Sequence, residues 1–458
     1  MEKVTPPAVL SIYKKLRDAG YQVFFVGGCV RDFLMDSTIT DWDFATDATP
    51  EEIKKVFPGS FYDNRFGTVG IPIPKVSEKK HEGVVEVTTF RTESGYKDAR
   101  RPEKISWGKT IEEDLSRRDF TMNAIALQLT QGKLQDDFID PYNGLKDIEK
   151  RIIRTVGNPN ERFAEDALRL LRAVRFSTQL DFKIQEKTWE AIIKNSRNIG
   201  KISGERIRDE LLKMLSTNHS YEGILLLDKS GMLELIIPEL AEGKGVSQAR
   251  PGRHHTTDVF THNIESLNKC PSSDPIVRLA TLLHDVGKPY VKKQDEEGYV
   301  IFYNHEVKGS RLAYEICKRL RLSKKQTEKI ANLIRWHMFT IDENITDSAI
   351  RRFIRRVGID NVADMMDLRI GDRLGGGTQV AESWRLKKFK ARVASELNPP
   401  FSVNDLAIDG NDIMEELKLK PGPKVGEILR KLFEEVDEDL SRNTREHLLS
   451  RIKELFNK

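Results

Sequence analysis

The chain has few cysteines and no long apolar run. Its three cysteines, Cys29, Cys270 and Cys317, stand far apart among 458 residues, and none belongs to a Cys-x-x-Cys pair. This spacing argues against a disulfide framework and a cysteine metal site, and it favours a reducing cytoplasm. No apolar stretch approaches the roughly 18 residues that a membrane helix needs, and the N-terminus lacks a charged-then-apolar signal segment. We therefore expect a soluble cytoplasmic protein that does not contact membranes.

The chain also has little net charge. Its 75 Lys and Arg residues are nearly balanced by 71 Asp and Glu residues, which leaves a formal charge of +4. Whole-molecule charge therefore says little about partners, and any nucleic-acid surface must be local.

The hydrophobic pattern changes near residue 150. Before that point, β-like runs at 23–27, 68–73 and 84–90 alternate with helix-like stretches such as 50–56. After it, apolar residues recur at helical spacing to the end of the chain. Single cores stop growing at about 250 to 300 residues, and breaks rich in Gly or Pro mark boundaries. The sequence thus predicts an α+β protein, with a mixed α/β domain over 1–150 and all-helical parts over 151–245, 246–380 and 381–458.

A glycine pair followed by two aspartates is the first pattern with chemical meaning. Gly27 and Gly28 follow a predicted strand and precede a predicted helix, where backbone amides can face a phosphate. Asp41 and Asp43 lie one residue apart on an extended segment, so their carboxylates point to the same side. Such a pair can hold Mg²⁺ together with substrate phosphates, and Glu86 is a candidate third carboxylate. Taken alone, either pattern also fits an ordinary turn.

The series Gly27-Gly-x-Val-Arg-Asp32 followed by Asp41-x-Asp43 resembles the signature of the bacterial-type, class II tRNA nucleotidyltransferase and poly(A) polymerase family. Segment 114–123 resembles the family's sugar-reading motif, 140–147 its linker between head and neck, and 165–169 its base-pairing motif. The resemblance implies a head that adds nucleotides from CTP and ATP to tRNA 3′ ends without a template, using Mg²⁺. The nucleotide-binding residues that it implies are Gly27, Gly28, Arg31, Asp32, Arg118, Asp119, Asn123, Asp166 and Arg169.

The spacing of Asp166 and Arg169 supports the base-pairing role. On a predicted helix these residues stand at i and i+3 and so share a face. An acceptor beside a forked donor can address the Watson–Crick edge of a base. A surface ion pair is the alternative interpretation of this pair alone.

A polar and basic stretch over 93–113 contains Lys97, Arg100 and Arg101, and it predicts a mobile loop that contacts RNA. In the resembled family, a loop at this place is associated with the switch to A addition. Its presence argues against an enzyme that adds only C. It leaves open whether the added string is CCA or only its terminal A.

Histidines concentrate in the third part of the chain, where six of the nine lie between His254 and His337. Neutral imidazoles with carboxylates suit Mn, Fe, Ni, Co or Zn better than Mg. The order of the candidate ligands resembles the HD phosphohydrolase superfamily, with extra histidines that resemble a second-metal variant. The resemblance implies hydrolysis of 2′,3′-cyclic or terminal phosphates. For the last ligand, Asp372, the nearby Asp364 and Asp367 are alternatives, because the sequence does not fix the helix register. The candidate ligands are His262, His284, Asp285, His305, His337 and Asp372.

The last part of the chain resembles the tRNA-gripping tail of CCA-adding enzymes, through 407–414, 420–426 and Asn443. The segment Pro421-Gly-Pro423 caps the start of a predicted helix. The free amides of this helix, with Lys424, Arg430 and Lys431, are candidate contacts to RNA phosphates. We therefore predict a nucleotidyltransferase head, a helical neck, an HD domain and a tRNA-binding tail. The alternatives are a poly(A) polymerase, or a phosphohydrolase whose head senses nucleotides. The sequence does not indicate an oligomeric state.

Overall fold

The computed structural model of the chain describes residues 5–62, 67–73, 83–97, 101–130, 133–248, 257–339, 341–342, 344–396 and 402–456. The chain forms two compact units, Met1–Ala241 and Glu242–Lys458. None of the helices in the described ranges combines the length and the apolarity that a membrane crossing requires.

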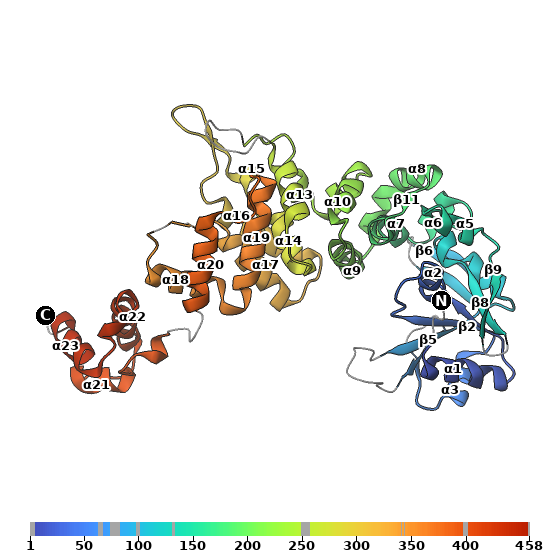
Figure 1. The fold of residues 1–458 in the computed structure, drawn as a ribbon, viewed down its shortest axis with the longest axis horizontal. Helices are drawn as coiled ribbons and strands as arrows, with labels where there is room; N and C mark the ends of the chain where they lie inside the picture. Colours follow the sequence, from blue (N-terminus) through green and yellow to red (C-terminus); the bar gives the residue numbers. More distant parts are fainter. Residues whose placement is uncertain are drawn as a thin grey trace. The chain divides into compact units, whose positions relative to one another are not determined.

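A seven-stranded mixed sheet forms the framework of the first unit (Figure 1). The strand order is β3-β4-β5-β2-β1-β8-β9, in which β2 and β5 are parallel and every other neighbouring pair is antiparallel. The strands are β1 (Val23–Val26), β2 (Trp42–Thr46), β3 (Phe61–Tyr62), β4 (Thr68–Pro72), β5 (Val84–Thr89), β8 (Ala126–Thr130) and β9 (Lys133–Ile139). The three predicted strands and the mixed α/β class are confirmed.

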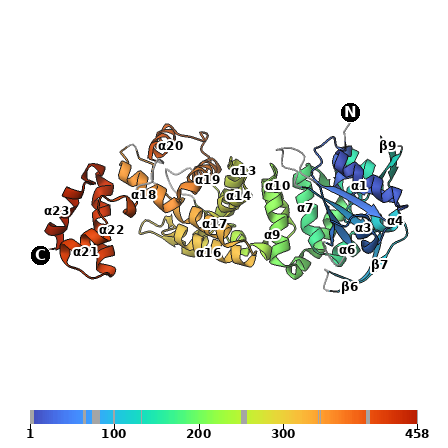
Figure 2. The ribbon, with the colours of Figure 1, turned by 90° about the horizontal axis from the view of Figure 1, so that it is seen from below.

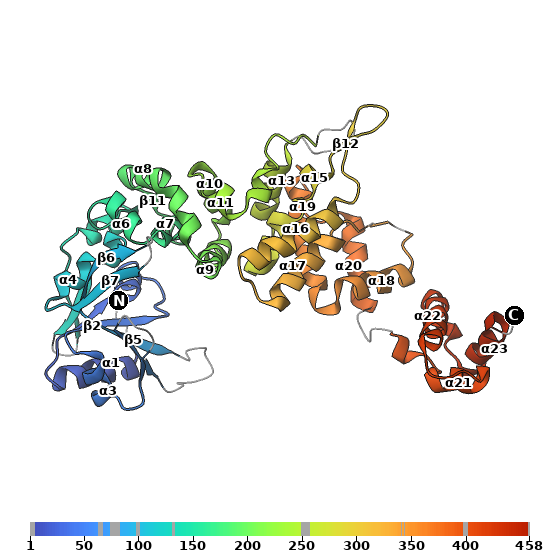
Figure 3. The same ribbon diagram turned by 180° about the vertical axis from the view of Figure 1, so that it is seen from behind.

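Each face of this sheet has its own apolar core, because successive side chains of a strand point to opposite faces. Phe25 packs with Leu16 and Ile53, whereas its neighbour Phe24 packs with Leu115 on the other face. The first core is covered by α1 and α3, which lie next to each other along one face of the sheet in Figures 1 and 3. The helices before residue 150 are α1 (Pro7–Asp18), α2 (Gly28–Leu34), α3 (Pro50–Val56), α4 (Ile111–Ser116) and α5 (Gly144–Glu149).

Helix α3 begins and ends as the sequence predicts. Its N-cap residue Thr49 and the third helical residue Glu52 form a reciprocal capping box, and Pro50 occupies the first helical position. Both features satisfy or remove backbone donors that a helix N-terminus leaves open.

The expected mobile loop over 93–113 is not a loop throughout. Its first part belongs to a two-stranded antiparallel ribbon of β6 (Arg91–Lys97) and β7 (Arg101–Trp107), in register from Arg91 opposite Trp107 to Lys97 opposite Arg101. A polar composition does not exclude such a ribbon, because the hydrogen bonds of an antiparallel pair are formed by the backbone whatever the side chains. The prediction of a loop was therefore wrong for these residues.

The rest of the first unit is mostly helical, as predicted. It contains α6 (Pro159–Glu165), α7 (Leu168–Leu180), α8 (Glu186–Asn195), α9 (Gly204–Leu215), α10 (Ser220–Lys229), α11 (Leu233–Ile236) and α12 (Pro238–Ala241). It is not strictly all-helical, since β10 (Ile152–Ile153) and β11 (Lys183–Ile184) form a short parallel pair. Pairs of this length carry too little sequence periodicity to be predicted.

The second unit consists mainly of helices, with α16 and α17 adjacent to each other (Figure 3). A two-residue ribbon, β12 (Lys293–Gln294) with β13 (Val300–Ile301), is again an exception to the all-helical expectation. The helices are α13 (Val259–Lys269), α14 (Pro275–Leu283), α15 (Lys288–Val291), α16 (His305–Arg319), α17 (Lys324–Trp336), α18 (Asp347–Val357), α19 (Val362–Gly375) and α20 (Trp384–Glu396).

Three further helices end the chain and share a core of their own (Figure 2). They are α21 (Gly410–Leu417), α22 (Pro423–Glu438) and α23 (Arg445–Phe456). Asp409 caps α21, and α22 begins at Pro423 as predicted. The amide of Asn443 donates to the carbonyl of Asp405 at 2.8 Å and its oxygen accepts from the Ala407 N–H at 2.8 Å, so this residue fixes the local chain path.

Candidate functional site

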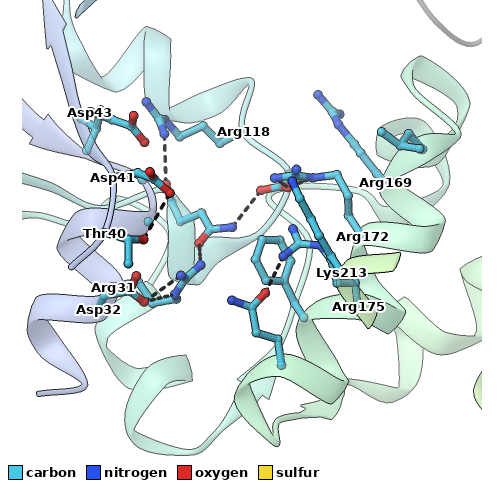
Figure 4. Close-up of a pocket in the computed structure, with 18 of the residues that line it drawn as sticks. Arg31, Asp32, Thr40, Asp41, Asp43, Arg118, Arg169, Arg172, Arg175 and Lys213 are labelled. Carbon is cyan, nitrogen blue, oxygen red and sulfur yellow. Dashed lines mark hydrogen bonds and ion pairs between the residues drawn. The ribbon is translucent and has the colours of Figure 1, made fainter. Parts of the chain in front are cut away.

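A cleft of about 1040 Å³ opens in the first unit between the sheet and the helices that follow it. Figure 4 shows Asp41 and Asp43 on the side of the sheet and Arg169, Arg172 and Arg175 on the side of the green helices. Every predicted catalytic and nucleotide-binding residue lines this cleft: Gly27, Gly28, Arg31, Asp32, Asp41, Asp43, Glu86, Arg118, Asp119, Asn123, Asp166 and Arg169.

The glycine pair forms the turn between β1 and α2. Gly27 has φ of +73°, a conformation that side chains of L-residues rarely adopt. A Cβ atom at Gly27 would lie 3.0 Å from Nη1 of Arg118 and 3.4 Å from Oδ2 of Asp43. Two independent constraints thus require glycine, and the N-terminus of α2 faces the cleft.

The three acidic candidates converge because of the sheet topology. Asp43 in β2 is the register partner of Glu86 in the parallel strand β5, so the two side chains leave the same face. Asp41 lies one residue before β2, where its Oδ2 accepts a hydrogen bond from Oγ1 of Thr40 at 3.2 Å. Burial raises the pKa of Asp43 to about 7, and the charge of Glu86 adds to this increase. The three carboxylates repel one another, and a divalent cation would relieve this repulsion.

A chain of polar contacts joins the sheet to the following helices. Arg31 donates from Nε and Nη2 to Oδ1 of Asp32 at 2.9 and 2.7 Å, and from Nη1 to Oδ1 of Asn123 at 3.0 Å. The Asn123 amide donates to Asp119 at 3.2 Å, and Asp119 pairs with Arg172 at 2.6 Å. Burial alone would raise the pKa of Asp119, but the charges of Arg172 and then Arg169 hold it at about 2. The network is therefore charged and fixed in place.

Arg118 stands near both the glycine turn and the acidic group. Its guanidinium binds Oδ2 of Asp114 at 3.0 Å, while the neighbouring Arg117 binds Oδ1 of the same carboxylate at 2.6 Å. Burial opposes ionisation of Asp114, yet the two arginines keep its pKa below the ordinary value. Asp114 thus positions Arg118 at the cleft.

Asp166 and Arg169 do not share a continuous helix, so that part of the prediction was wrong. Helix α6 ends at Glu165, Asp166 has an extended backbone with φ of −140° and ψ of 106°, and α7 begins at Leu168. The break occurs because the Asp166 carboxylate accepts the Leu168 N–H at 3.0 Å, as residues at helix starts do. Both side chains nevertheless line the cleft. Asp166 pairs with Arg206 at 2.8 Å, and Arg169 pairs with Glu165 at 2.7 Å.

The sequence interpretation missed two arginines that also line the cleft. Arg172 and Arg175 follow the predicted Arg169 at intervals of three residues along α7, and this spacing in an otherwise apolar helix was the available signal. Arg172 and Arg175 lie 5.2 and 3.8 Å from the ring centroid of Phe176, and Arg175 bonds Glu210 at 2.5 Å. These cations suit a triphosphate or RNA backbone.

The histidine cluster of the second unit is built from five elements or their ends. His284, His305 and His337 each place Nδ1 at hydrogen-bonding distance from the carbonyl three residues earlier, at 2.8, 2.8 and 2.7 Å. With Nδ1–H donated to a carbonyl, the lone pair of Nε2 points into the cluster. The Nε2 atoms of His262 and His284 are 3.2 Å apart, and those of His305 and His337 are 3.4 Å apart. Facing imidazole nitrogens at this distance are typical of metal ligands.

Asp285 lies between the two histidine pairs. Its Oδ2 is 3.4 Å from His262 and 3.3 Å from His284, whereas its Oδ1 is 3.2 Å from His305 and 3.7 Å from His337. Among the described residues, the compact ligand groups with atoms within 4.8 Å of one another are His262, His284 and Asp372, and His284, Asp285 and His337.

The structure also decides among the aspartates of α19. Oδ1 of Asp372 lies 3.3 Å from His262, while Asp364 pairs with Lys329 at 2.9 Å. Lys288 pairs with Asp285.

The carboxylates of the cluster favour positive charge on their neighbours. Burial alone would lower the pKa of His284, but the carboxylates of Asp285 and Asp372 raise it to about 10. The pKa values of both aspartates fall well below the usual range despite burial: Lys288 and His284 favour the Asp285 carboxylate, while His262 and His284 favour that of Asp372. Burial lowers the pKa of His337. Histidine and carboxylate donors in a buried pocket fit a transition metal.

The predicted RNA contacts have different outcomes. Arg100 and the side chains of Lys97 and Arg101 lie outside the described residues. In α22, Lys424, Arg430 and Lys431 are exposed, with Arg430 donating to the Gly426 carbonyl at 3.2 Å and Lys431 pairing with Glu427 at 3.5 Å. Exposure leaves these three cations accessible to a phosphate.

Comparisons with known proteins match the chain over most of its length. The profile described as the poly A polymerase head domain matches residues 23–154, the one described as a probable RNA and SrmB-binding site of polymerase A matches 181–244, and the one described as a putative tRNA nucleotidyltransferase domain 2 matches 294–452. A CCA-adding enzyme of Ligilactobacillus salivarius is 33% identical over 450 residues, covering 98% of this chain and 96% of that protein. An A-adding tRNA nucleotidyltransferase of Deinococcus radiodurans is 33% identical, covering 89% of this chain and 90% of its own. The crystal structure of the Bacillus stearothermophilus CCA-adding enzyme in complex with CTP is 26% identical, with a TM-score of 0.73 and coverage of 98% of both chains.

Proposed function

The chain belongs to the family of CCA-adding and A-adding tRNA nucleotidyltransferases, and from this premise we propose that its first unit adds CCA, or the terminal A alone, to tRNA 3′ ends. Its substrates are CTP, ATP and tRNA. The observation that carries the proposal is the convergence of Asp41, Asp43 and Glu86 on one side of a cleft whose other side presents arginines.

The acidic residues fit a magnesium site. Asp41, Asp43 and Glu86 would hold Mg²⁺, which neutralises the triphosphate and lowers the pKa of the attacking 3′-hydroxyl. The backbone at Gly27 leaves room for the phosphates, and the first amides of α2 donate to them. Arg118 adds a cation beside the same turn.

Base choice falls to Asp166 and Arg169. In the structure these side chains are paired with Arg206 and Glu165, so they must exchange partners to meet the edge of an incoming base. Asn123, with Arg31 and Asp32, would contact the ribose, and Arg31 holds the group together by donating to both Asp32 and Asn123.

The second unit carries the proposal of a metal-dependent phosphohydrolase for 2′,3′-cyclic or terminal phosphates. His262, His284 and Asp372 would hold one cation and His305 and His337 a second, with one oxygen of Asp285 toward each pair. The donors suit Mn, Ni, Co, Fe or Zn, and such a cation would lower the pKa of a water molecule and polarise the phosphoester.

Four functional parts follow from these roles. We assign 1–150 to the nucleotidyltransferase head, 151–245 to the helical neck, 246–380 to an HD domain and 381–458 to a tRNA-binding tail. The cations at Lys424, Arg430 and Lys431 would contact the tRNA backbone.

One set of reactions tests the first activity. The protein is incubated with tRNA lacking CCA, lacking CA or lacking only A, with CTP and ATP supplied separately. A CCA-adding enzyme extends all three substrates and then stops, whereas an A-adding enzyme extends only the last. Growth that runs on beyond three nucleotides would instead establish a poly(A) polymerase, the second candidate, which the profile of the head domain also fits. Phosphate release without any nucleotide incorporation would favour a phosphohydrolase with a nucleotide-sensing head.

A further inference from the structure

A second pocket, of about 400 Å³, lies in the second unit next to the histidine cluster. Two of its lining residues, Trp336 and Met338, flank the cluster residue His337 in the chain, and a third, Glu306, follows His305. A volume of this size accommodates one small ligand, since ligand pockets usually range from about 300 to 1,000 Å³.

Aromatic rings form one part of the pocket lining. The ring of Phe339 lies 4.7 Å from that of Phe353 and 5.5 Å from that of Phe389, with the latter pair stacked. The guanidinium carbons of Arg335 and Arg356 lie 4.4 and 4.9 Å from the ring centroid of Trp336. Trp336 and Phe339 are partly exposed, whereas Phe353 and Phe389 are buried. Accessible aromatic faces bind nucleobases by stacking, without strong preference for one base.

Two guanidinium groups give the pocket a positive charge. Arg352 and Arg356 lie on the exposed side of α18, and neither has a carboxylate partner among the described residues. Arg352 donates to the hydroxyl of Ser348 at 3.2 Å. Arg335 differs, because Glu306 pairs with it at 3.4 Å. The pocket thus holds two cations whose charge is not neutralised.

The other arginines of the same helix show what a neutralised pair looks like. Arg351 and Arg355 bind the carboxylate of Asp437 in α22 at 3.0 and 2.6 Å. Helix α18 therefore uses one pair of arginines to hold the tail helix and presents the next pair to the pocket. Guanidinium groups are well suited to phosphate, which they can bind through two parallel hydrogen bonds.

The pocket is also linked to the cluster through side chains. The guanidinium of Arg369 lies 5.6 Å from the Phe339 ring and donates to Oδ2 of Asp372 at 2.8 Å. A ligand that moves Phe339 would therefore also shift Arg369 and, through it, the candidate metal ligand Asp372.

We propose that this pocket binds the nucleoside phosphate at an RNA 3′ end, with the base on the aromatic rings and a phosphate on Arg352 and Arg356. The bound nucleotide presents that end to the histidine cluster, a role that rests on the phosphohydrolase function proposed above. A free mononucleotide has the same chemistry, so the test must separate it from an RNA end.

Binding is measured first, on the full chain in EDTA, so that the result does not depend on metals. The five tryptophans are labelled with 5-fluorotryptophan, and the Trp336 resonance is assigned with Trp336→Phe. Titration with 3′-AMP should shift this resonance, and Arg352→Ala with Arg356→Ala should weaken the binding by about tenfold or more. Lys324→Ala with Lys325→Ala removes the same charge at the other end of α17, roughly 18 Å away, and should leave the titration unchanged. No shift at millimolar 3′-AMP, or an equal shift with inorganic phosphate alone, would overturn the pocket.

Hydrolysis then separates the pocket from the activity of the cluster. Wild-type protein loaded with Mn²⁺, Ni²⁺ or Co²⁺ is assayed on bis(p-nitrophenyl) phosphate and on an RNA with a 2′,3′-cyclic end. If neither is cleaved, the proposed phosphohydrolase function is wrong, while the 3′-AMP titration still judges the pocket. If both are cleaved, the arginine double variant should raise KM for the RNA end by about tenfold with a smaller change in kcat. A KM for the RNA end that equals the wild-type value, with 3′-AMP binding weakened, would assign the pocket to a free nucleotide and overturn the RNA-end proposal.

Discussion

The two candidate centres of this chain differ in how their potential cation ligands are arranged. In the first unit, Asp41, Asp43 and Glu86 line one side of an open cleft, and arginines line the opposite side. In the second, His262, His284 and His337 are almost fully buried and already face Asp285 and Asp372. The first arrangement needs substrate phosphates to complete the coordination of Mg²⁺, whereas the second offers a nearly complete set of protein donors.

The largest effect is expected from removing the buried acid of the cleft. Asp43→Ala should lower CMP and AMP incorporation by at least about 10³-fold, because several kcal/mol of charge stabilisation are lost at 1.36 kcal/mol per tenfold. Hydrolysis of a 2′,3′-cyclic RNA end to the phosphomonoester should continue, as measured on the same protein. Glu51→Ala, an exposed acid on α3, is the control. Wild-type incorporation by Asp43→Ala would exclude the cleft as the transfer site.

The reciprocal change is made in the buried cluster. His284→Ala with Asp285→Ala should lower hydrolysis of the 2′,3′-cyclic end by about 10² to 10³-fold, because two ligands of the cation are removed. Incorporation of nucleotides into tRNA should persist. Lys324→Ala with Lys325→Ala serves as the control in the same unit. Simultaneous loss of both activities in a protein that remains folded by circular dichroism would contradict two independent centres.

A smaller effect is expected from adding a methyl group to the glycine turn. In Gly27→Ala, the added Cβ would be strained by the positive φ and would lie 3.0 Å from Nη1 of Arg118. Because Arg118 and the turn would be displaced, nucleotide incorporation should fall by about 10 to 100-fold. The positive φ, in a region that other residues rarely occupy, should also cost roughly 1–3 kcal/mol of stability, measured by urea unfolding. Gly59→Ala is the matched control, because nothing lies within 4 Å of its added Cβ. Equal behaviour of the two variants would show that the turn does not position the phosphates.

The smallest effect concerns base choice. Arg206→Ala releases the Asp166 carboxylate from its ion pair, which is partly exposed and so contributes up to about 1 kcal/mol. The ratio of CTP to ATP use on tRNA lacking CCA should therefore change by about fivefold, with total incorporation altered less. Arg208→Ala is the control, because Arg208 is the next arginine of the same helix and pairs with Asp209 at 2.7 Å. An unchanged ratio would place nucleotide selection elsewhere in the cleft.

The sequence predicted local features correctly where their cause lies within one short segment. The helix over 50–56 and the helix start at Pro423 agree with the structure because capping and proline act within a few residues. It failed where a polar segment pairs with itself, as in the β6–β7 ribbon, and where one side chain interrupts a helix, as at Asp166. Arg172 and Arg175 of α7 were not predicted, because their carboxylate partners Asp119 and Glu210 lie far from them in the sequence.

What the sequence by itself determined is the chemistry available: carboxylates one residue apart after a glycine turn, a histidine-rich third part, and the order of motifs that places the chain in its family. The tertiary structure decided which of these groups meet. Parallel pairing of β2 and β5 sets Glu86 beside Asp43, and the phase of α19 turns Asp372 toward His262 while Asp364 reaches Lys329. Strand register and helix phase depend on contacts between residues far apart in the chain. For that reason residue types are readable from the sequence, whereas the geometry of the two centres is not.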